Sequence, residues 1–255
     1  MRRRSGSTEA SAWRPADPAL AARVSRRVLY QAQSPLSGLV KVVDVGVDRR
    51  LTLDGSVLSV YARDGDWTRA RQEYWGEALD MVPLPRRPAV LFVGLGGGTQ
   101  LHLLRERVTP RHVTAIERDP LIVRLAQRWF GLDQIPRLEF LCAEAEVAAA
   151  ALVRARRRFD FVMEDCTYDE TRDRSIPLAV SLARLVSRRG VLVINRHRRP
   201  HARATAAALG PYFAVIRLRR VRREADNILV CATSPRRPHA GRVTAPPREG
   251  DGRAG

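Results

Sequence analysis

Between residues 89 and 194, five short apolar runs alternate with four segments of helical periodicity, and this alternation constrains the fold more than any other feature. The runs are AVLFV (89–93), HVTAIE (112–117), RLEFLC (137–142), FDFVM (159–163) and GVLVI (190–194). The helical segments lie between them, at residues 99–107, 120–130, 146–157 and 175–188. Strands that are apolar along their whole length are typical of a parallel sheet covered by helices on both faces. The pattern therefore predicts an α/β fold.

The flanking segments have other periodicities. Residues 28–66 alternate apolar with polar residues between turn signals such as SP, SG and DG, which predicts a small β domain built from hairpins. Residues 67–233 would form the larger α/β domain, closed by an antiparallel pair at 212–223 and 228–233. This domain would begin with a helix over 68–82, whose apolar face carries Tyr74, Trp75, Ala78, Leu79 and Val82. The ends, 1–27 and 234–255, are rich in Arg, Pro, Gly and Ser and are predicted to be disordered tails.

The net charge of +18 raises the question of a nucleic-acid partner. Lys41 is the sole lysine among 45 basic residues, and the arginines are scattered in pairs without aromatic residues between them on which bases could stack. We therefore expect nonspecific attraction to polyanions and no specific nucleic-acid site. No apolar run approaches the roughly 20 residues that span a bilayer, and none follows the basic N-terminus. We expect no membrane association and a cytoplasmic protein.

The histidines and cysteines lack the spacing of metal ligands. His197 and His201 are four residues apart, but Pro200 lies between them and argues against one continuous helix that presents both. Three cysteines are widely spaced in apolar contexts, which favours reduced thiols in the core: Cys142, Cys166 and Cys231. We expect no metal.

The segment VLFVGLGGGTQLHLL (90–104) places a glycine cluster between an expected strand and an expected helix. Such a loop turns backbone N–H groups toward a ligand, and a side chain on it would hold that ligand away. A phosphate-binding P-loop is excluded because no Gly-Lys-Ser/Thr follows, and the dinucleotide pattern G-x-G-x-x-G meets Thr99 at its third glycine. Gly94, Gly96 and Gly98 fit G-x-G-x-G, which favours S-adenosylmethionine or a related donor.

Three acids follow the next strands of the predicted sheet. Glu117 is placed to accept both ribose hydroxyls of a nucleoside, Glu144 to take the amine of adenine, and Asp165 to lie at the reacting group. Each acid alone is more simply explained as a solvated strand end or a helix cap. Their joint spacing, at the edge where open α/β sheets bind ligands, favours a nucleoside site.

Three further segments carry a family resemblance: LYQAQSPLSGLVKVV (29–43), LTLDG (51–55) and YWGEALDMVPL (74–84). With the glycine loop and the acids, they resemble the polyamine aminopropyltransferases, the spermidine synthases and their relatives, over residues 28 to about 233. The resemblance implies a small N-terminal β-hairpin domain and a methyltransferase-like, Rossmann-type core with a seven-stranded, mostly parallel sheet. It also implies a homodimer that transfers an aminopropyl group from decarboxylated S-adenosylmethionine to putrescine or a similar amine.

The same resemblance assigns roles to single residues. Asp165 would hold and deprotonate the attacking amine, and the acceptor amine would be bound by Trp75, Glu77, Tyr168 and Asp169. The family's acid that binds the donor's amino group is replaced by Gly97, so we expect weaker discrimination against intact S-adenosylmethionine. Other family positions are also changed, at Leu36, Ser37, Leu58, Trp75 and Gly76. A methyltransferase that uses S-adenosylmethionine and a non-catalytic nucleoside-binding paralogue therefore stay open as alternatives.

Overall fold

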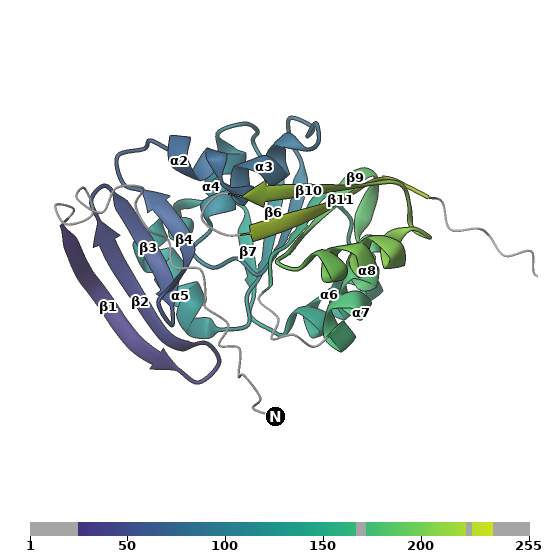
Figure 1. The fold of residues 1–255 in the computed structure, drawn as a ribbon. Coiled ribbons are helices and arrows are strands. Elements are labelled where there is room, and N and C mark those ends of the chain that lie inside the picture. Colours follow the sequence, from purple (N-terminus) through teal and green to yellow (C-terminus); the bar gives the residue numbers. More distant parts are fainter. Residues whose placement is uncertain (1–24, 167–171, 223–225, 237–255) are drawn as a thin grey trace, which may run out of the picture.

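The computed structural model describes residues 25–166, 172–222 and 226–236, which form two sheets with helices packed around them (Figure 1). The first sheet is antiparallel and follows chain order: β1 (Arg26–Ser34), β2 (Gly38–Val45), β3 (Asp48–Leu53) and β4 (Ser56–Ala62). Its inner face carries Val40, Val42 and Leu51, which are buried in one cluster with Phe130 of helix α5 (Pro120–Phe130). One buried and one solvated face account for the alternating sequence of this segment.

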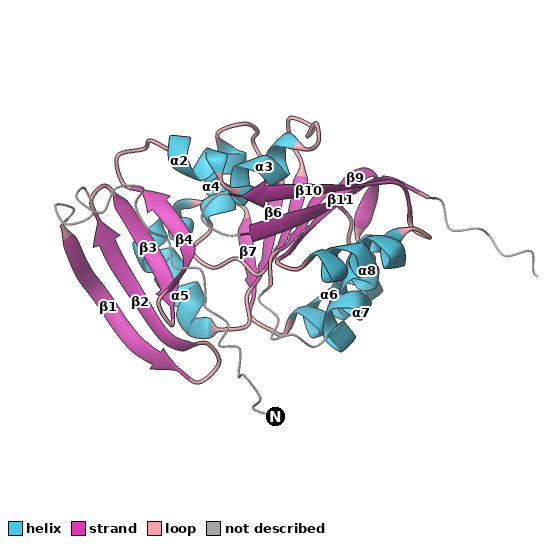
Figure 2. Ribbon diagram, in the orientation of Figure 1, coloured by secondary structure: helices cyan, strands magenta, loops and turns pink. Residues whose placement is uncertain are grey.

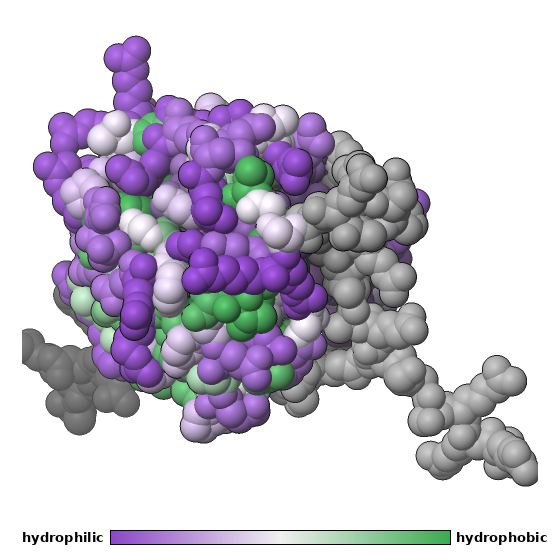
Figure 3. Space-filling model, turned by 90° about the vertical axis from the view of Figure 1, so that its left-hand side faces the viewer, coloured by the Kyte–Doolittle hydropathy of each residue, from purple (hydrophilic) through white to green (hydrophobic). Residues whose placement is uncertain are grey.

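The outer face of the first sheet is of mixed polarity. Viewed from that side of the molecule, small apolar areas lie among hydrophilic residues (Figure 3). Val28, Leu36 and Val47 are exposed large apolar side chains of this sheet and its turns. Arg27 and Gln31 of β1 are exposed on the same strand as Val28.

The second sheet has seven strands in the order β10-β11-β9-β8-β5-β6-β7. Five of them are parallel: β5 (Ala89–Val93), β6 (His112–Ile116), β7 (Leu138–Leu141), β8 (Phe159–Glu164) and β9 (Val186–Arg196). β11 (Asp226–Pro235) pairs antiparallel with β9, and β10 (Phe213–Arg222) pairs antiparallel with β11. The α/β class and the mostly parallel, seven-stranded sheet are confirmed.

Helices cover both faces of the second sheet (Figure 2). One face packs against α2 (Thr68–Gln72), α3 (Tyr74–Asp80) and α4 (Thr99–Arg105), and the other against α6 (Ala145–Arg154), α7 (Arg172–Ala183) and α8 (Arg199–Leu209). Successive strand residues point to opposite faces, so Phe161 belongs to one buried cluster and Val162 to the other. None of the described helices is long and apolar enough to span a membrane.

The order of strands reverses between β5 and β8. From β5 the chain continues outward to β6 and β7, and it then returns to β8 on the other side of β5. In open α/β sheets, ligands bind at the carboxyl ends of the strands where the order reverses in this way. The glycine loop and the three predicted acids all follow strands that end at this edge.

The helix predicted over 68–82 is broken into α2 and α3 at Glu73, whose backbone is extended. After this break, Gly76 lies against the backbone carbonyl of Arg71, where an added Cβ would be 2.1 Å from the oxygen. Only glycine fits this approach. The larger residue that the resemblance places at position 76 would therefore not fit the present backbone.

Other local details differ from the sequence predictions. The helix predicted over 175–188 ends at Ala183, because Val186 already pairs with Phe159 as part of β9. Helix α8 was not predicted, and it begins at Arg199 with Pro200 in its first turn, where proline's missing N–H has no helical partner to lose. Of the predicted core thiols, Cys142 is exposed because it follows the edge strand β7.

Candidate functional site

The glycine loop between β5 and α4 packs closely against the protein's own chain. Gly94, Gly96 and Gly98 have positive φ angles of 78°, 55° and 80°, a region that other residues rarely adopt. A Cβ on Gly94 would lie 2.7 Å from the backbone oxygen of Asp165, and a Cβ on Gly96 would lie 2.7 Å from Oγ of Ser59. Backbone conformation and close packing therefore require glycine here, in addition to any approach of a ligand.

Strand β4 of the first sheet holds this loop. The N–H of Gly97 donates to Oγ of Ser59 over 2.7 Å, and the hydroxyl of Thr99 donates to the carbonyl of Val60 over 2.9 Å. Gly97 has no room for a side chain, since a Cβ would lie 2.9 Å from both the Phe130 ring and the Cβ of Ser59. An acid at this position, which the family would direct at the donor's amino group, does not fit the present arrangement.

Glu117 follows β6 and turns its carboxylate toward the loop. Its Oε2 accepts from the N–H of Gly96 at 3.3 Å, and its Oε1 accepts from the N–H of Asp119 at 3.1 Å. Burial raises the pKa of Glu117, although the hydrogen bonds from the backbone of Asp119 and Gly96 oppose that rise. A half-buried acceptor beside a fixed loop is compatible with the predicted ribose-binding role.

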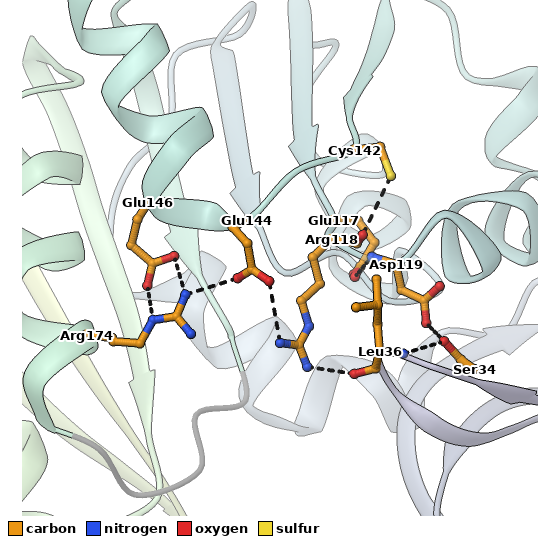
Figure 4. Close-up of polar contacts among 9 residues, drawn as sticks. All are labelled: Ser34, Leu36, Glu117, Arg118, Asp119, Cys142, Glu144, Glu146 and Arg174. Atoms are coloured by element: carbon orange, nitrogen blue, oxygen red, sulfur yellow. Dashed lines mark hydrogen bonds and ion pairs between the residues drawn. The ribbon is translucent and has the colours of Figure 1, made fainter.

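Glu144 precedes α6, and its carboxylate lies between two arginines (Figure 4). Its Oε2 is 3.2 Å from Nη2 of Arg174, and its Oε1 is 3.8 Å from Nη1 of Arg118. Arg174 also pairs with Glu146, and Arg118 donates to the carbonyl of Leu36. An adenine amine would share the half-exposed Glu144 carboxylate with two guanidinium groups, one at 3.2 Å and one at 3.8 Å.

The turn between β1 and β2 is attached beside Glu117 (Figure 4). The hydroxyl of Ser34 donates to the carboxylate of Asp119, which also accepts from the N–H of Leu121 at 2.8 Å and so caps α5. Burial alone would raise the pKa of Asp119, but these hydrogen bonds and one from Ser37 outweigh burial and lower it. The first sheet therefore contacts the site through this turn as well as through β4.

Asp165, directly after β8, accepts hydrogen bonds on both carboxylate oxygens. The hydroxyl of Tyr74 in α3 donates to Oδ2 over 2.7 Å, and Nδ2 of Asn195 in β9 donates to Oδ1 over 2.9 Å. The same Nδ2 donates to Oδ1 of Asn227 in β11 over 2.9 Å. Burial, and then the Asp165 carboxylate, raise the pKa of Tyr74 well above 10, so the tyrosine stays a donor. These contacts fix the orientation of Asp165 beside Gly94.

Sequence reasoning missed Tyr74, Asn195 and Asn227 as neighbours of Asp165. Asn195 follows the apolar run 190–194, so the rule that selected the three acids at strand ends would have selected it as well. Tyr74 was assigned to an apolar helical face, and no local pattern connects it to Asp165.

A buried ion pair adjoins Asp165 in the chain. The side chain of Glu164, at the end of β8, is 0% exposed, and that of Arg196, at the end of β9, is 6% exposed, with 2.5 Å between Oε2 and Nη1. Burial raises the pKa of Glu164, and the charge of Arg196 opposes the rise. Oε1 of Glu164 accepts from the N–H of Cys166 at 3.0 Å. This carboxylate therefore anchors the residues on either side of Asp165.

We expect Arg196→Met to lower the free energy of unfolding by about 3–5 kcal/mol, because it leaves Glu164 buried without its cation. Urea denaturation measures this loss. Arg188→Met, an exposed arginine of the same strand, is the matched control and should change stability by less than ~0.5 kcal/mol. Adding Glu164→Leu to Arg196→Met should recover part of the loss. A loss below ~1 kcal/mol in the single variant would contradict the importance of the pair.

The residues predicted to bind the acceptor are only partly brought to Asp165. Trp75 is 9% exposed and belongs to the core, with its ring centroid 4.9 Å from that of Tyr74. Glu77 forms an ion pair with Arg219 of β10. Tyr168 and Asp169 lie outside the described residues.

The two sheets and their topology define an α/β fold of the spermidine synthase and methyltransferase type. Spermidine synthase from Thermotoga maritima has this fold, with a TM-score of 0.60 and 16% identity over 82% of this chain and 73% of that one. Human methyltransferase-like protein 13 in complex with SAH aligns with a TM-score of 0.50 and 26% identity, over 64% of this chain and 78% of that one. No protein-family model matches the chain.

Curated proteins of two kinds are similar in sequence. The human eEF1A lysine and N-terminal methyltransferase is 28% identical over 173 residues, which are 62% of this chain and 24% of that protein. The polyamine aminopropyltransferase of Vibrio vulnificus is 26% identical over 118 residues, which are 44% of this chain and 38% of that protein. The match thus spans about a quarter of the length of the methyltransferase.

Proposed function

We propose that this protein is an amine methyltransferase that uses S-adenosylmethionine as the methyl donor. One observation carries the proposal: the glycine loop contacts the Glu117 carboxylate at Gly96 and the backbone of Asp165 at Gly94. A nucleoside held by Glu117 would therefore place its sulfonium group near Asp165. The amine nitrogen would attack the methyl carbon while the carbon–sulfur bond breaks and its electrons remain on sulfur. Asp165 would orient the amine and take its proton.

The surroundings of Gly97, where the amino acid part of the donor would bind, support methyl transfer over aminopropyl transfer. The crowding around Gly97 keeps an acid from this position, so a donor carboxylate would meet no negative charge there. Glu77, which the resemblance assigns to the acceptor amine, is already paired with Arg219. A diamine would find fewer free carboxylates for its second ammonium group. The names of the similar methyltransferases also specify lysine and N-terminal amines as acceptors.

Aminopropyl transfer from decarboxylated S-adenosylmethionine is the second candidate. It is favoured by the four-stranded sheet that precedes the core and by the hydrogen bonds from this sheet to the glycine loop. The extent of the alignment with a spermidine synthase, 82% of this chain, also supports it.

Isothermal titration calorimetry with S-adenosylmethionine, its decarboxylated form and 5′-methylthioadenosine tests the proposal. We expect the intact donor to bind at least as tightly as the decarboxylated one. Mass spectrometry of putrescine and of a lysine-containing peptide after incubation would then identify a methylated product. Preference for the decarboxylated donor with an aminopropylated product would establish the second candidate. Binding of none of the three nucleosides would refute both and leave a paralogue that has lost the donor.

A further inference from the structure

Strand β10 forms one edge of the seven-stranded sheet. Its only strand neighbour among the described residues is β11, so its outer row of backbone N–H and C=O groups has no strand partner in that part of the chain. The strand is ten residues long and regularly paired over nearly its whole length. Long, regular edges of this kind can accept another extended segment by strand addition.

The side chains of β10 define the chemistry of such a segment. Four arginines of the strand are exposed: Arg217, Arg219, Arg220 and Arg222. Arg219 pairs with Glu77 and Arg220 with Asp226, but no ion pair joins Arg217 to an acid within the described ranges. Two apolar side chains of the strand are also exposed: Val215, which precedes the arginines, is 37% exposed, and Leu218, between Arg217 and Arg219, is 45% exposed. The edge therefore matches a segment that alternates acidic and apolar residues.

A second copy of the chain is a poor partner for this edge. A twofold pairing of two β10 strands centred on any of residues 217–220, where the strand carries its charges, would place at least one arginine opposite an arginine of the other copy. Like charges directly opposite each other destabilise a strand pair. The charge pattern favours an acidic segment of a different protein.

The location of β10 connects this edge to the site. Val221 pairs with Asn227, and Asn227 is joined through Asn195 to Asp165, so the end of β10 lies at the same edge of the sheet as the site. Four strand spacings, about 19 Å, separate β8 from a strand added outside β10. About six extended residues cover that distance.

We infer that β10 binds an extended acidic segment of a protein substrate by strand addition, and that an amine about six residues from this segment reaches Asp165. The second half of the inference rests on the proposed function, whereas the first half concerns binding alone.

Fluorescence polarisation with the full chain tests the binding. The probe is a ten-residue peptide of alternating valine and glutamate. Two matched probes replace glutamate with lysine or methylate every second backbone nitrogen, which keeps the charge and blocks strand pairing. We expect the acidic probe to bind, the methylated probe to bind at least about tenfold more weakly, and the lysine probe not to bind. Equal binding of the methylated probe would overturn strand addition, and failure of the acidic probe would overturn the whole inference.

Protein variants locate the contact. Arg217→Glu should weaken binding of the acidic probe about tenfold, whereas Arg154→Glu, the same charge change at an exposed position of α6, should leave it within about twofold. Equal effects of the two variants would assign the binding to net charge and contradict the contact. If Arg217→Glu lowers the melting temperature, Arg222→Glu repeats the test. A single-stranded oligonucleotide that displaces the acidic probe from β10 would assign the edge to nucleic acid.

The reach to Asp165 is tested by adding a glycine leader with a free N-terminal amine to the acidic probe. A leader of about six residues should be methylated, and a leader of one residue should not. Donor binding, measured by calorimetry in the same samples, separates the two ideas. Donor binding without peptide binding refutes the docking edge and keeps the proposed function. Peptide binding without donor binding keeps the docking edge and refutes the proposed function.

Discussion

Asp165→Asn should slow transfer about 10²–10⁴-fold while the affinity for the donor stays unchanged. An asparagine cannot take the proton of an attacking amine. It also offers one acceptor oxygen where Asp165 now offers two, so either the Tyr74 hydroxyl must accept from the new amide or Asn195 loses its acceptor at this position. Single-turnover kinetics with saturating donor measure the rate, and calorimetry with 5′-methylthioadenosine measures the affinity.

Asp133→Asn, at an exposed position of the short helix after α5, is the matched control and should leave both quantities unchanged. A rate in the Asp165 variant equal to that of the unmodified protein would remove Asp165 from the mechanism. A large loss of donor affinity would instead place Asp165 in donor binding.

Glu117→Ala should weaken binding of 5′-methylthioadenosine at least about 100-fold, because hydrogen bonds to a charged acceptor contribute about 1.5–3 kcal/mol each and a ribose can make two. Burial raises the pKa of Glu117 above its usual 4.5. Protonation would remove the charged acceptor, so affinity should begin to fall at a higher pH than for an exposed glutamate. Calorimetry across a series of pH values measures this onset, and the variant should lose the dependence.

The same shift makes a prediction for Glu117→Gln without ligand. A carboxyl whose pKa is higher in the folded chain than in the unfolded chain contributes stability at low pH, and that contribution is lost as the pH rises through the folded pKa. At neutral pH the partly buried charge therefore costs stability, which Glu117→Gln relieves, but the amide keeps only one of the two oxygens that accept from Gly96 and Asp119. The two effects oppose each other, so the variant should unfold within about 1 kcal/mol of the unmodified protein. Weak nucleoside binding combined with undiminished stability would separate a binding role from a structural one. A clear loss of stability would contradict the prediction.

The strand and helix pattern was predictable wherever local signals and packing agree. Helix α5 runs from 120 to 130 as predicted, because Asp119 caps its start and Gly131, with a φ of 68°, ends it. Prediction failed at 184–188, where Leu178, Leu182 and Leu185 continue the helical repeat although Val186 pairs with the sheet. Strand pairing depends on residues that are distant in the sequence, so a local helical repeat does not reveal it.

The candidate site was predictable only as far as topology places it. Strand ends bring Glu117 and Asp165 to the glycine loop, and both follow strands that the sequence indicates. The ion-pair partners of Glu144 could not be predicted, because Arg118 and Arg174 come from separate segments and no sequence spacing relates them to Glu144. Homodimeric assembly and a cytoplasmic location stay predictions.

The hydrogen bond from Gly97 to Ser59 joins positions 38 residues apart. The Ser59 side chain also limits the space at Gly96 and Gly97, and the Phe130 ring limits it at Gly97, so a larger residue at position 97 would need changes at positions 59 and 130 as well. Evolution of donor preference in this chain would then be epistatic, with a permissive change in the N-terminal sheet needed before the loop itself could vary.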